Sequence, residues 1–226
     1  MPATLDQQME TASQALAELD YARCESLCVD ALGQARRAAD WVMYQRVLLP
    51  LQEARRQRRQ AALDGPILLG TPADTDSVAA QVADIEQGCV VLTWPCTAKE
   101  AKAMGDKVRA CKRPIELLFA DNASDSTTWR ITSLAGPELS VDLPAPISDW
   151  IGQWVDPAAI APPTPAHWFM RSSEALGNAG LAAIDAKVGS LAYLQALEHA
   201  LSCVDDHEIL HQRLAAAAKA LNEAKR

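Results

Sequence analysis

Aromatic side chains are scarce in this sequence, where they make up 5% of 226 residues, and no apolar run is long. A membrane-spanning helix needs ~20 consecutive apolar residues, so we expect no membrane segment. The opening residues, MPATLDQQMETAS, also lack the apolar core of a secretory signal, which predicts a cytoplasmic protein. Alanine is abundant instead. Because alanine is the best helix former, the composition favours helices.

The cysteines contain no C-x-x-C pair, the spacing that is typical of many zinc and redox sites. In a chain without an export signal, we expect reduced thiols that fill space in the core. The six cysteines stand at positions 24, 28, 89, 96, 111 and 203.

An excess of basic residues is also missing, since the formal net charge is -8. An acidic chain repels a phosphate backbone at long range, which argues against general nucleic-acid binding. No glycine-rich loop of the form G-x-G-x-x-G or G-x-x-x-x-G-K-[ST] is present, so a nucleotide fingerprint is absent. One local basic cluster fits either a solvated helix end or a site for an anionic partner. It contains Arg55, Arg56, Arg58 and Arg59.

Residues 65–143 are expected to form an α/β domain. Short apolar runs alternate there with amphipathic stretches of helical period, which predicts β-α-β-α-β with parallel pairing. The apolar runs are PILLG, CVVLTW and IELLFA, at 66–70, 89–94 and 115–120. Two further runs, TTWRITSL and ELSVDL, flank Ala135-Gly136-Pro137 and indicate a hairpin at the sheet edge.

Helical periodicity dominates on both sides of this domain, over residues 1–64 and 167–226. Residues 144–166 are rich in proline and indicate a linker, in which ISDWIGQWV has the apolar spacing of a short tryptophan-bearing helix. The last helices are expected over 168–185, 188–203 and 206–224, the third of them capped by Asp205-Asp206. The predicted fold class is therefore mixed α/β. It has a small, mostly parallel sheet with an antiparallel edge hairpin, and repeat-like helical hairpins flank it at both termini.

Small residues in the first region follow a regular spacing. Ala12 is followed by a turn at Asp20-Tyr21, and then by Cys24, Cys28 and Ala31. This spacing resembles tetratricopeptide repeats, in which pairs of antiparallel helices recur in units of about 34 residues. The resemblance places Ala12 on the leading helix and the cysteines on the second helix. Trp41 stands near the position of a tryptophan in a following repeat.

A similar spacing occurs near the C-terminus. Leu176-Gly177 resembles the Leu-Gly pair of the same family, and Gly189, Tyr193 and Ala196 follow at the small, aromatic and small positions. The resemblance implies protein–protein interaction on a concave helical face rather than catalysis. Because at least three stacked units are normally needed for stability, it also implies that the ends pack together, onto the α/β domain or onto another subunit.

The most specific motif is HEILH, which matches the H-E-x-x-H pattern of zinc metalloproteases. It would supply His207 and His211 as ligands and Glu208 as the general base. No third ligand follows at the spacing of a known class, and His199, on the preceding predicted helix, is the nearest candidate. We therefore expect no zinc cofactor, and zinc-dependent hydrolysis is the third hypothesis.

A second candidate site lies where the parallel strands are expected to end. Ligands of open parallel sheets bind beyond the carboxyl ends of the strands. Cys96 would also lie near a helix start, where the helix dipole favours its thiolate and could make it a catalytic nucleophile. The side chains expected at this edge are Thr71, Thr93, Trp94, Cys96, Asp121 and Asn122.

These observations lead to three hypotheses. The first is a non-enzymatic scaffold or adaptor that binds another protein or a further copy of itself. The second is a small enzyme or ligand-binding protein that uses the strand edge around Trp94 and Cys96. The third is the zinc hydrolase built on His207, Glu208 and His211.

Overall fold

The computed structural model describes residues 4–71, 75–121, 127–157 and 163–225. It divides into two compact units. The first, here called the helical unit, is formed by residues 1–58, 183–201 and 205–226. The second, the sheet unit, is formed by residues 59–182 and 202–204. The chain therefore passes between the units four times, after residues 58, 182, 201 and 204.

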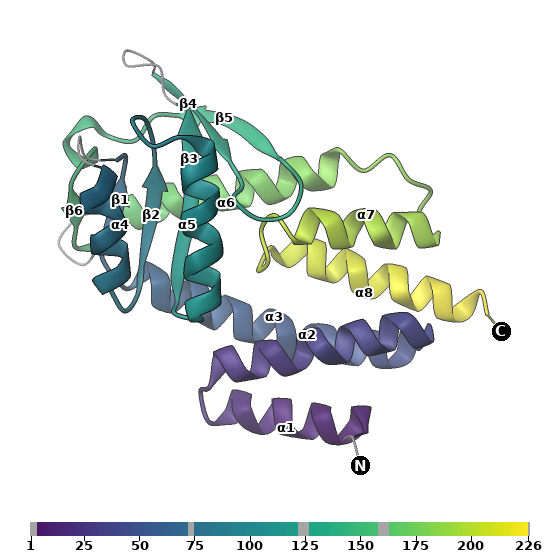
Figure 1. Cartoon of the computed structure of the whole chain (residues 1–226). Helices are drawn as coiled ribbons and strands as arrows, with labels where there is room; N and C mark the ends of the chain where they lie inside the picture. Colours follow the sequence, from purple (N-terminus) through teal and green to yellow (C-terminus); the bar gives the residue numbers. More distant parts are fainter. Residues whose placement is uncertain (1–3, 72–74, 122–126, 158–162, 226) are drawn as a thin grey trace. The chain divides into compact units, whose positions relative to one another are not determined.

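The N-terminal part of the helical unit is a helical hairpin followed by a long third helix. The helices are α1 (Leu5–Ala17), α2 (Tyr21–Ala38) and α3 (Trp41–Leu63), the last of which belongs to this unit as far as Arg58. Figure 1 shows that α2 runs opposite to α1 and that α3 returns in the direction of α1. Small residues of α1 and α2 are fully buried, and their size lets the two helices approach closely. They are Ala12, Cys24, Cys28 and Ala31.

Helices from both ends of the chain form one unit. The C-terminal pair consists of α7 (Leu191–Leu201) and α8 (Glu208–Glu223). Glu198 on α7 accepts hydrogen bonds from the Tyr44 hydroxyl at 2.8 Å and from Arg36 Nε at 3.2 Å. Lys225 Nζ donates to the carbonyl of Ala39 at 2.7 Å, where α2 ends. The two ends therefore pack together, one of the three arrangements that the resemblance implied.

The sheet unit contains a six-stranded sheet in the order β5-β4-β3-β2-β1-β6. Its strands are β1 (Ile67–Leu69), β2 (Gly88–Leu92), β3 (Ile115–Asp121), β4 (Thr128–Thr132), β5 (Ser140–Pro144) and β6 (Trp154–Val155). β1, β2 and β3 are parallel, and the other three pairs are antiparallel. The predicted α/β class, the parallel centre and the edge hairpin are confirmed. The prediction of a mostly parallel sheet holds for the centre alone, since β6 adds an antiparallel pair at the opposite edge.

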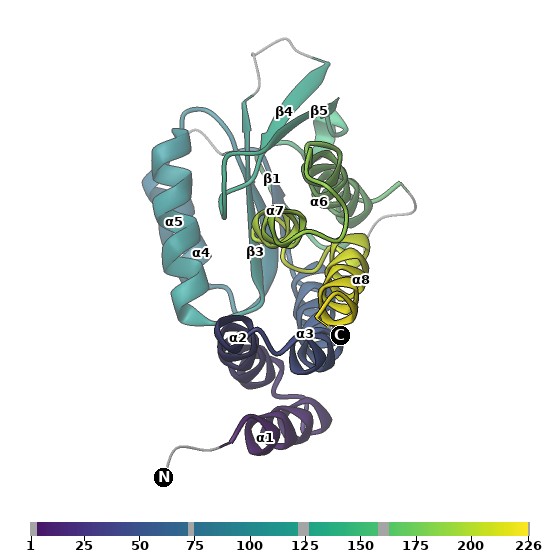
Figure 2. The ribbon, with the colours of Figure 1, turned by 90° about the vertical axis from the view of Figure 1, so that its right-hand side faces the viewer.

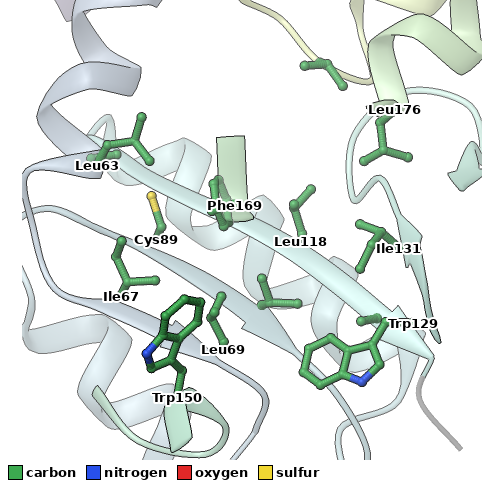
Figure 3. Close-up of a cluster of buried hydrophobic side chains, with 14 of the residues drawn as sticks. Leu63, Ile67, Leu69, Cys89, Leu118, Trp129, Ile131, Trp150, Phe169 and Leu176 are labelled. Carbon is green, nitrogen blue, oxygen red and sulfur yellow. The ribbon is translucent and has the colours of Figure 1, made fainter. Parts of the chain in front are cut away.

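Helices cover both faces of this sheet, which is why β1 and β2 are buried along their whole length. Figure 2 shows α4 (Thr75–Asp84) and α5 (Ala98–Cys111) on one face and α6 (Pro165–Ala182) on the other. In Figure 3, Phe169 and Leu176 of α6 lie against the strand residues of their face. Their partners in this core include Ile67, Leu69, Cys89, Leu118, Trp129 and Ile131. Among the helices of the described ranges, none is both long enough and apolar enough to cross a bilayer.

The tryptophan island does not form the amphipathic helix that its spacing predicts. Helical structure is limited to one 3-10 turn, Ser148–Trp150, and the chain then continues into β6. Gly152 has a φ of +77°, a left-handed conformation that ends the turn and that glycine adopts without strain. Its amide donates to the carbonyl of Leu69 at 2.9 Å, so the segment is held as an edge of the sheet.

The C-terminal repeat predicted from Leu176 to Ala196 draws its residues from both units, since α6 belongs to the sheet unit and α7 to the helical unit. Leu176 lies on α6, and it is fully buried in the core beneath the sheet. Within the helical unit, α7 packs against α8. The spacing of Leu176-Gly177 therefore reflects packing of α6 on the strands, and the small Gly177 is buried there as well.

A short segment between α7 and α8 returns to the sheet unit. Gly136, in the loop between β4 and β5, has a φ of +66°, and a Cβ at this position would lie 2.9 Å from the backbone carbonyl carbon of Ser202. Cys203 Sγ donates to the carbonyl of Pro137 at 3.3 Å. Residues 202–204 are therefore packed tightly against this loop.

Candidate functional site

The carboxyl ends of β1 and β2 meet, as predicted, through two threonines. The amide of Thr71 donates to Thr93 Oγ1 at 2.9 Å, and the amide of Thr93 donates to Thr71 Oγ1 at 2.7 Å. Thr93 Oγ1 also donates to the carbonyl of Trp94 at 3.3 Å. Both hydroxyls are therefore engaged in holding the strand ends together, which leaves them little capacity to bind a ligand.

The remaining residues of this edge do not converge on the threonine pair. Trp94 points into solvent, with 79% of its surface exposed. Asp121 is exposed at the end of β3, where it stands opposite Arg130 of β4. β4 lies on one side of β3, and β2 lies on the other side. Asn122 lies outside the described residues. The predicted cluster is therefore not assembled into one site by the part of the chain that the structure describes.

Cys96 is a poor candidate for a nucleophile. Its thiol is 4% exposed and lies 3.5 Å from the carbonyl of Thr97. Burial raises the pKa of the Cys96 thiol, and the nearby carboxylate of Glu100 raises it further. The expectation that the start of α5 would favour a thiolate is therefore wrong, because desolvation outweighs the donors of the helix end.

The H-E-x-x-H motif straddles the start of α8 instead of lying within it. His207 is the N-cap, with extended backbone angles, and its Nδ1 accepts a hydrogen bond from the amide of Leu210 at 3.3 Å. The predicted cap at Asp205-Asp206 is therefore wrong by one to two residues. A zinc site of this type needs both histidines on one helical face. Since His207 precedes the helix, its Nδ1 accepts the capping hydrogen bond and is occupied by the helix end.

His211 is buried and engaged elsewhere. It is 1% exposed, and its Nε2 lies 2.9 Å from the carbonyl oxygen of Asp205. Burial lowers the pKa of His211 to about 4, so the ring is neutral at physiological pH. His199 is exposed on α7. Within the described ranges, no group of three or more His, Cys, Asp or Glu side chains is placed to hold a metal ion.

The arginine cluster of α3 forms internal ion pairs, and the interpretation of a solvated helix end fits Arg56 alone. Glu25 of α2 accepts from Arg55 Nε at 2.9 Å and also pairs with Arg58. Glu25 and Arg55 are 13% and 16% exposed at their side chains, which places this ion pair largely out of water. Within the sheet unit, Arg59 pairs with Glu116 at 3.3 Å. Arg56 is the solvated member, and it pairs with Glu53.

The helical unit carries an open groove that the sequence analysis did not find. It has a volume of about 1280 Å³ and lies between one face of α1 and one face of α3. Its apolar lining includes Leu49, which is 74% exposed on α3, together with Met9, Leu16 and Pro50. The sequence offered one signal for an unusual site on α3, which is the proline inside this helix. Pro50 has no N–H and leaves the carbonyl four residues earlier without its helical donor.

The groove is acidic. Asp6, Glu10 and Glu53 line it together with one cation, Arg46, which gives three negative charges against one positive charge. Arg46 Nη1 pairs with Asp6 across the two helices at 2.9 Å. Arg56 and Gln57 lower the pKa of Glu53, which is therefore ionised at neutral pH. Glu10 is exposed and has no ion-pair partner within the described ranges.

Comparison of the chain with protein-family models, with curated proteins and with solved structures found no match. The strand edge and the histidine motif are held by their own internal hydrogen bonds, whereas the α1–α3 groove exposes apolar side chains and an unpaired carboxylate.

Proposed function

We propose that this protein is a non-enzymatic interaction protein, and that its α1–α3 groove binds a basic polypeptide segment bearing apolar side chains. The observation that carries the proposal is the combination of apolar side chains with three carboxylates and one guanidinium in the lining of one groove. The partner is another protein.

The apolar part of the groove supports binding of side chains from a partner. Leu49 exposes a large aliphatic side chain to water. Covering this side chain with another apolar surface is favourable in free energy. Met9 is 6% exposed and forms part of the floor. α1 and α3 run in the same direction (Figure 1), and each supplies one wall of the groove. This arrangement suits an elongated ligand lying along the two helices.

The charge of the groove supports a basic partner. Opposite charges on the two surfaces would accelerate association and orient the segment, and this contribution would weaken with salt. Glu10 is the carboxylate that remains for a cation of the partner, because Asp6 and Glu53 already pair with Arg46 and Arg56.

The lining of the groove favours binding over catalysis. Its carboxylates are exposed or paired with arginine, and Ser13 donates its hydroxyl to the carbonyl of Met9 at 2.9 Å. A general acid needs a raised carboxyl pKa and a nucleophile needs an adjacent base. The shift found here is the opposite one, since the pKa of Glu53 is lowered.

A second copy of the chain is a less suitable partner. The most basic segment of this sequence is EARRQRRQ, and its arginines already pair with Glu25, Glu53 and Glu116. Each of these pairs would have to be broken before the segment could enter the groove of another copy.

The experiment is a selection from a random peptide library with the full chain, followed by calorimetric titration of the selected peptides. We expect peptides that combine Lys or Arg with Leu, Ile or Phe, and affinities that weaken as salt rises. Leu49→Asp should abolish binding, whereas Val42→Asp, also exposed on α3 at 51% but outside the groove, should not. Selection of acidic peptides, or equal loss in both variants, would overturn the proposal.

A further inference from the structure

A second groove lies in the sheet unit, between α4 and α5. It has a volume of about 710 Å³. Its walls are small or aliphatic, and its lining contains no aromatic ring. The deeper part of the groove is lined by Val82, Met104 and Val108. Exposed alanines from both helices form its rim, and these are Ala79, Ala83, Ala103 and Ala110.

The two ends of this groove differ in charge. Glu100 lies at the end near Cys96, and it is occupied as the capping partner of Thr97, whose amide and hydroxyl donate to it at 2.8 Å and 2.7 Å. Lys107 and Arg113 lie toward the other end. Arg113 Nη1 donates to the carbonyls of Ala83 and Ile85, which fixes the end of α4 beside the groove. Lys107 is exposed and has no ion-pair partner in the described part of the chain.

We propose that the α4–α5 groove binds an amphipathic anion with a single apolar chain, such as a fatty carboxylate. The acid group would lie at Lys107 and the chain would extend toward Cys96. This site is separate from the α1–α3 groove and does not depend on its function.

The shape and chemistry of the lining lead to this ligand. From the first turn of α5 to Lys107 the helix rises about 14 Å, so the groove is long in one direction. Between its charged ends the side chains that line it offer methyl and methylene surface and the buried thiol of Cys96. A ligand with polar groups along its length would leave them unsatisfied there, whereas an alkyl chain would not. One unpaired ammonium at the end of an apolar groove selects one terminal negative charge.

Cys111 provides a local reporter for the proposed ligand. It lines the groove and is exposed, whereas the other five cysteines are buried. A ligand with its acid group at Lys107 would lie within one helical turn of Cys111 and would slow its reaction with a maleimide.

The test uses the full chain with dodecanoate, dodecanol and dodecyltrimethylammonium as probes, monitored by calorimetry and by the rate of Cys111 modification. We expect saturable binding of dodecanoate that protects Cys111, and weaker binding of the neutral and cationic probes. Lys107→Glu should weaken dodecanoate binding at least about tenfold, as loss of a charge-assisted hydrogen bond predicts. Ala103→Trp should block binding of all probes by filling the groove.

The matched control is Lys99→Glu, which makes the same charge change at an exposed position of α5 that does not line the groove. It should leave dodecanoate affinity within about twofold of the unsubstituted protein, since an exposed charge outside contact distance acts weakly. Circular dichroism would confirm that each variant is folded. Absence of saturable binding, equal loss in both lysine variants, or unchanged binding in Ala103→Trp would overturn the proposal.

Discussion

The imidazole of His211 donates its Nε2–H to the carbonyl oxygen of Asp205, 2.9 Å away. A carbonyl oxygen can only accept a hydrogen bond, so the neutral ring carries its proton on Nε2. Nδ1 is then a buried acceptor, and no donor reaches it in the part of the chain that the structure describes. Protonation would place a second N–H in the same enclosed position, which is why burial lowers the pKa of this ring.

The first prediction concerns acid stability. The pKa of His211 is about 4 in the folded chain and 6.5 in its ordinary range, so the unfolded chain binds the proton first as pH falls. The contribution of neutral His211 is full above about pH 6.5, and it declines as pH falls toward 4. We expect the free energy of unfolding to drop by about 2 kcal/mol between pH 7 and pH 5, measured by urea titration.

His211→Leu is the matched variant for this experiment, because leucine fills much of the site without titrating. Its free energy of unfolding should lose less of its value over the same pH interval. An identical decline in both proteins would show that other groups cause the acid sensitivity.

The second prediction concerns Glu25, which pairs with both Arg55 and Arg58 at low exposure. Glu25→Gln leaves two partly buried guanidinium groups without their counter-charge. Because an uncompensated charge costs far more than a lost surface pair, we expect a loss of about 3 kcal/mol in the free energy of unfolding. The control is Glu53→Gln at the solvated pair with Arg56, where we expect a loss below about 1 kcal/mol. Similar losses of stability in the two variants would contradict the distinction between the buried ion pairs of Glu25 and the solvated pair of Glu53.

The third prediction separates a helix cap from a metal ligand at His207. Purified protein should contain far less than one zinc per chain by elemental analysis, and added zinc should not raise the melting temperature. His207→Ala should cost about 1 kcal/mol of stability through loss of the cap. His207→Asn should recover part of that loss, because the asparagine carbonyl can accept from the amide of Leu210. Stoichiometric zinc that is lost in His211→Ala would favour the metal site.

The fourth prediction concerns thiol reactivity. The pKa of Cys96 is raised and its side chain is buried, so it should react slowly with iodoacetamide at neutral pH. Cys111 is exposed and should react faster in the same sample. Peptide mapping by mass spectrometry after a short exposure measures both rates at once. Faster labelling of Cys96 than of Cys111 would restore the hypothesis of a catalytic cysteine.

The sheet was the most predictable part of this molecule. Continuous apolar runs such as CVVLTW and IELLFA are typical of central strands in a parallel sheet, and β2 and β3 follow them closely. β6 was not predictable, because Trp154–Val155 is held by backbone pairing with β1 and carries no periodicity of its own. The apolar spacing of the island comes from Trp150 entering the core while the chain turns at Gly152.

The candidate sites were less predictable than the fold, since each depends on side-chain contacts that the sequence pattern does not specify. The H-E-x-x-H pattern predicts two histidine ligands within a helix, but α8 begins one residue after His207, so this histidine is a cap. Thr71 and Thr93 were correctly expected at adjacent strand ends, yet their spacing gave no sign that each would bond the amide of the other. The α1–α3 groove combines side chains about 40 residues apart, such as Asp6 and Arg46, and no local pattern reports such a pairing.

The fourfold passage of the chain between its two units has a consequence for the order of folding. The ribosome releases α1, α2 and α3 before the sheet unit, but the helical unit is completed by residues 205–226, which are synthesised after it. The sheet unit lacks only residues 202–204 by the time α6 has emerged, and that short segment fills the space beside Gly136. The strands synthesised in the middle of the chain can therefore assemble before the helices that precede them find their final partners.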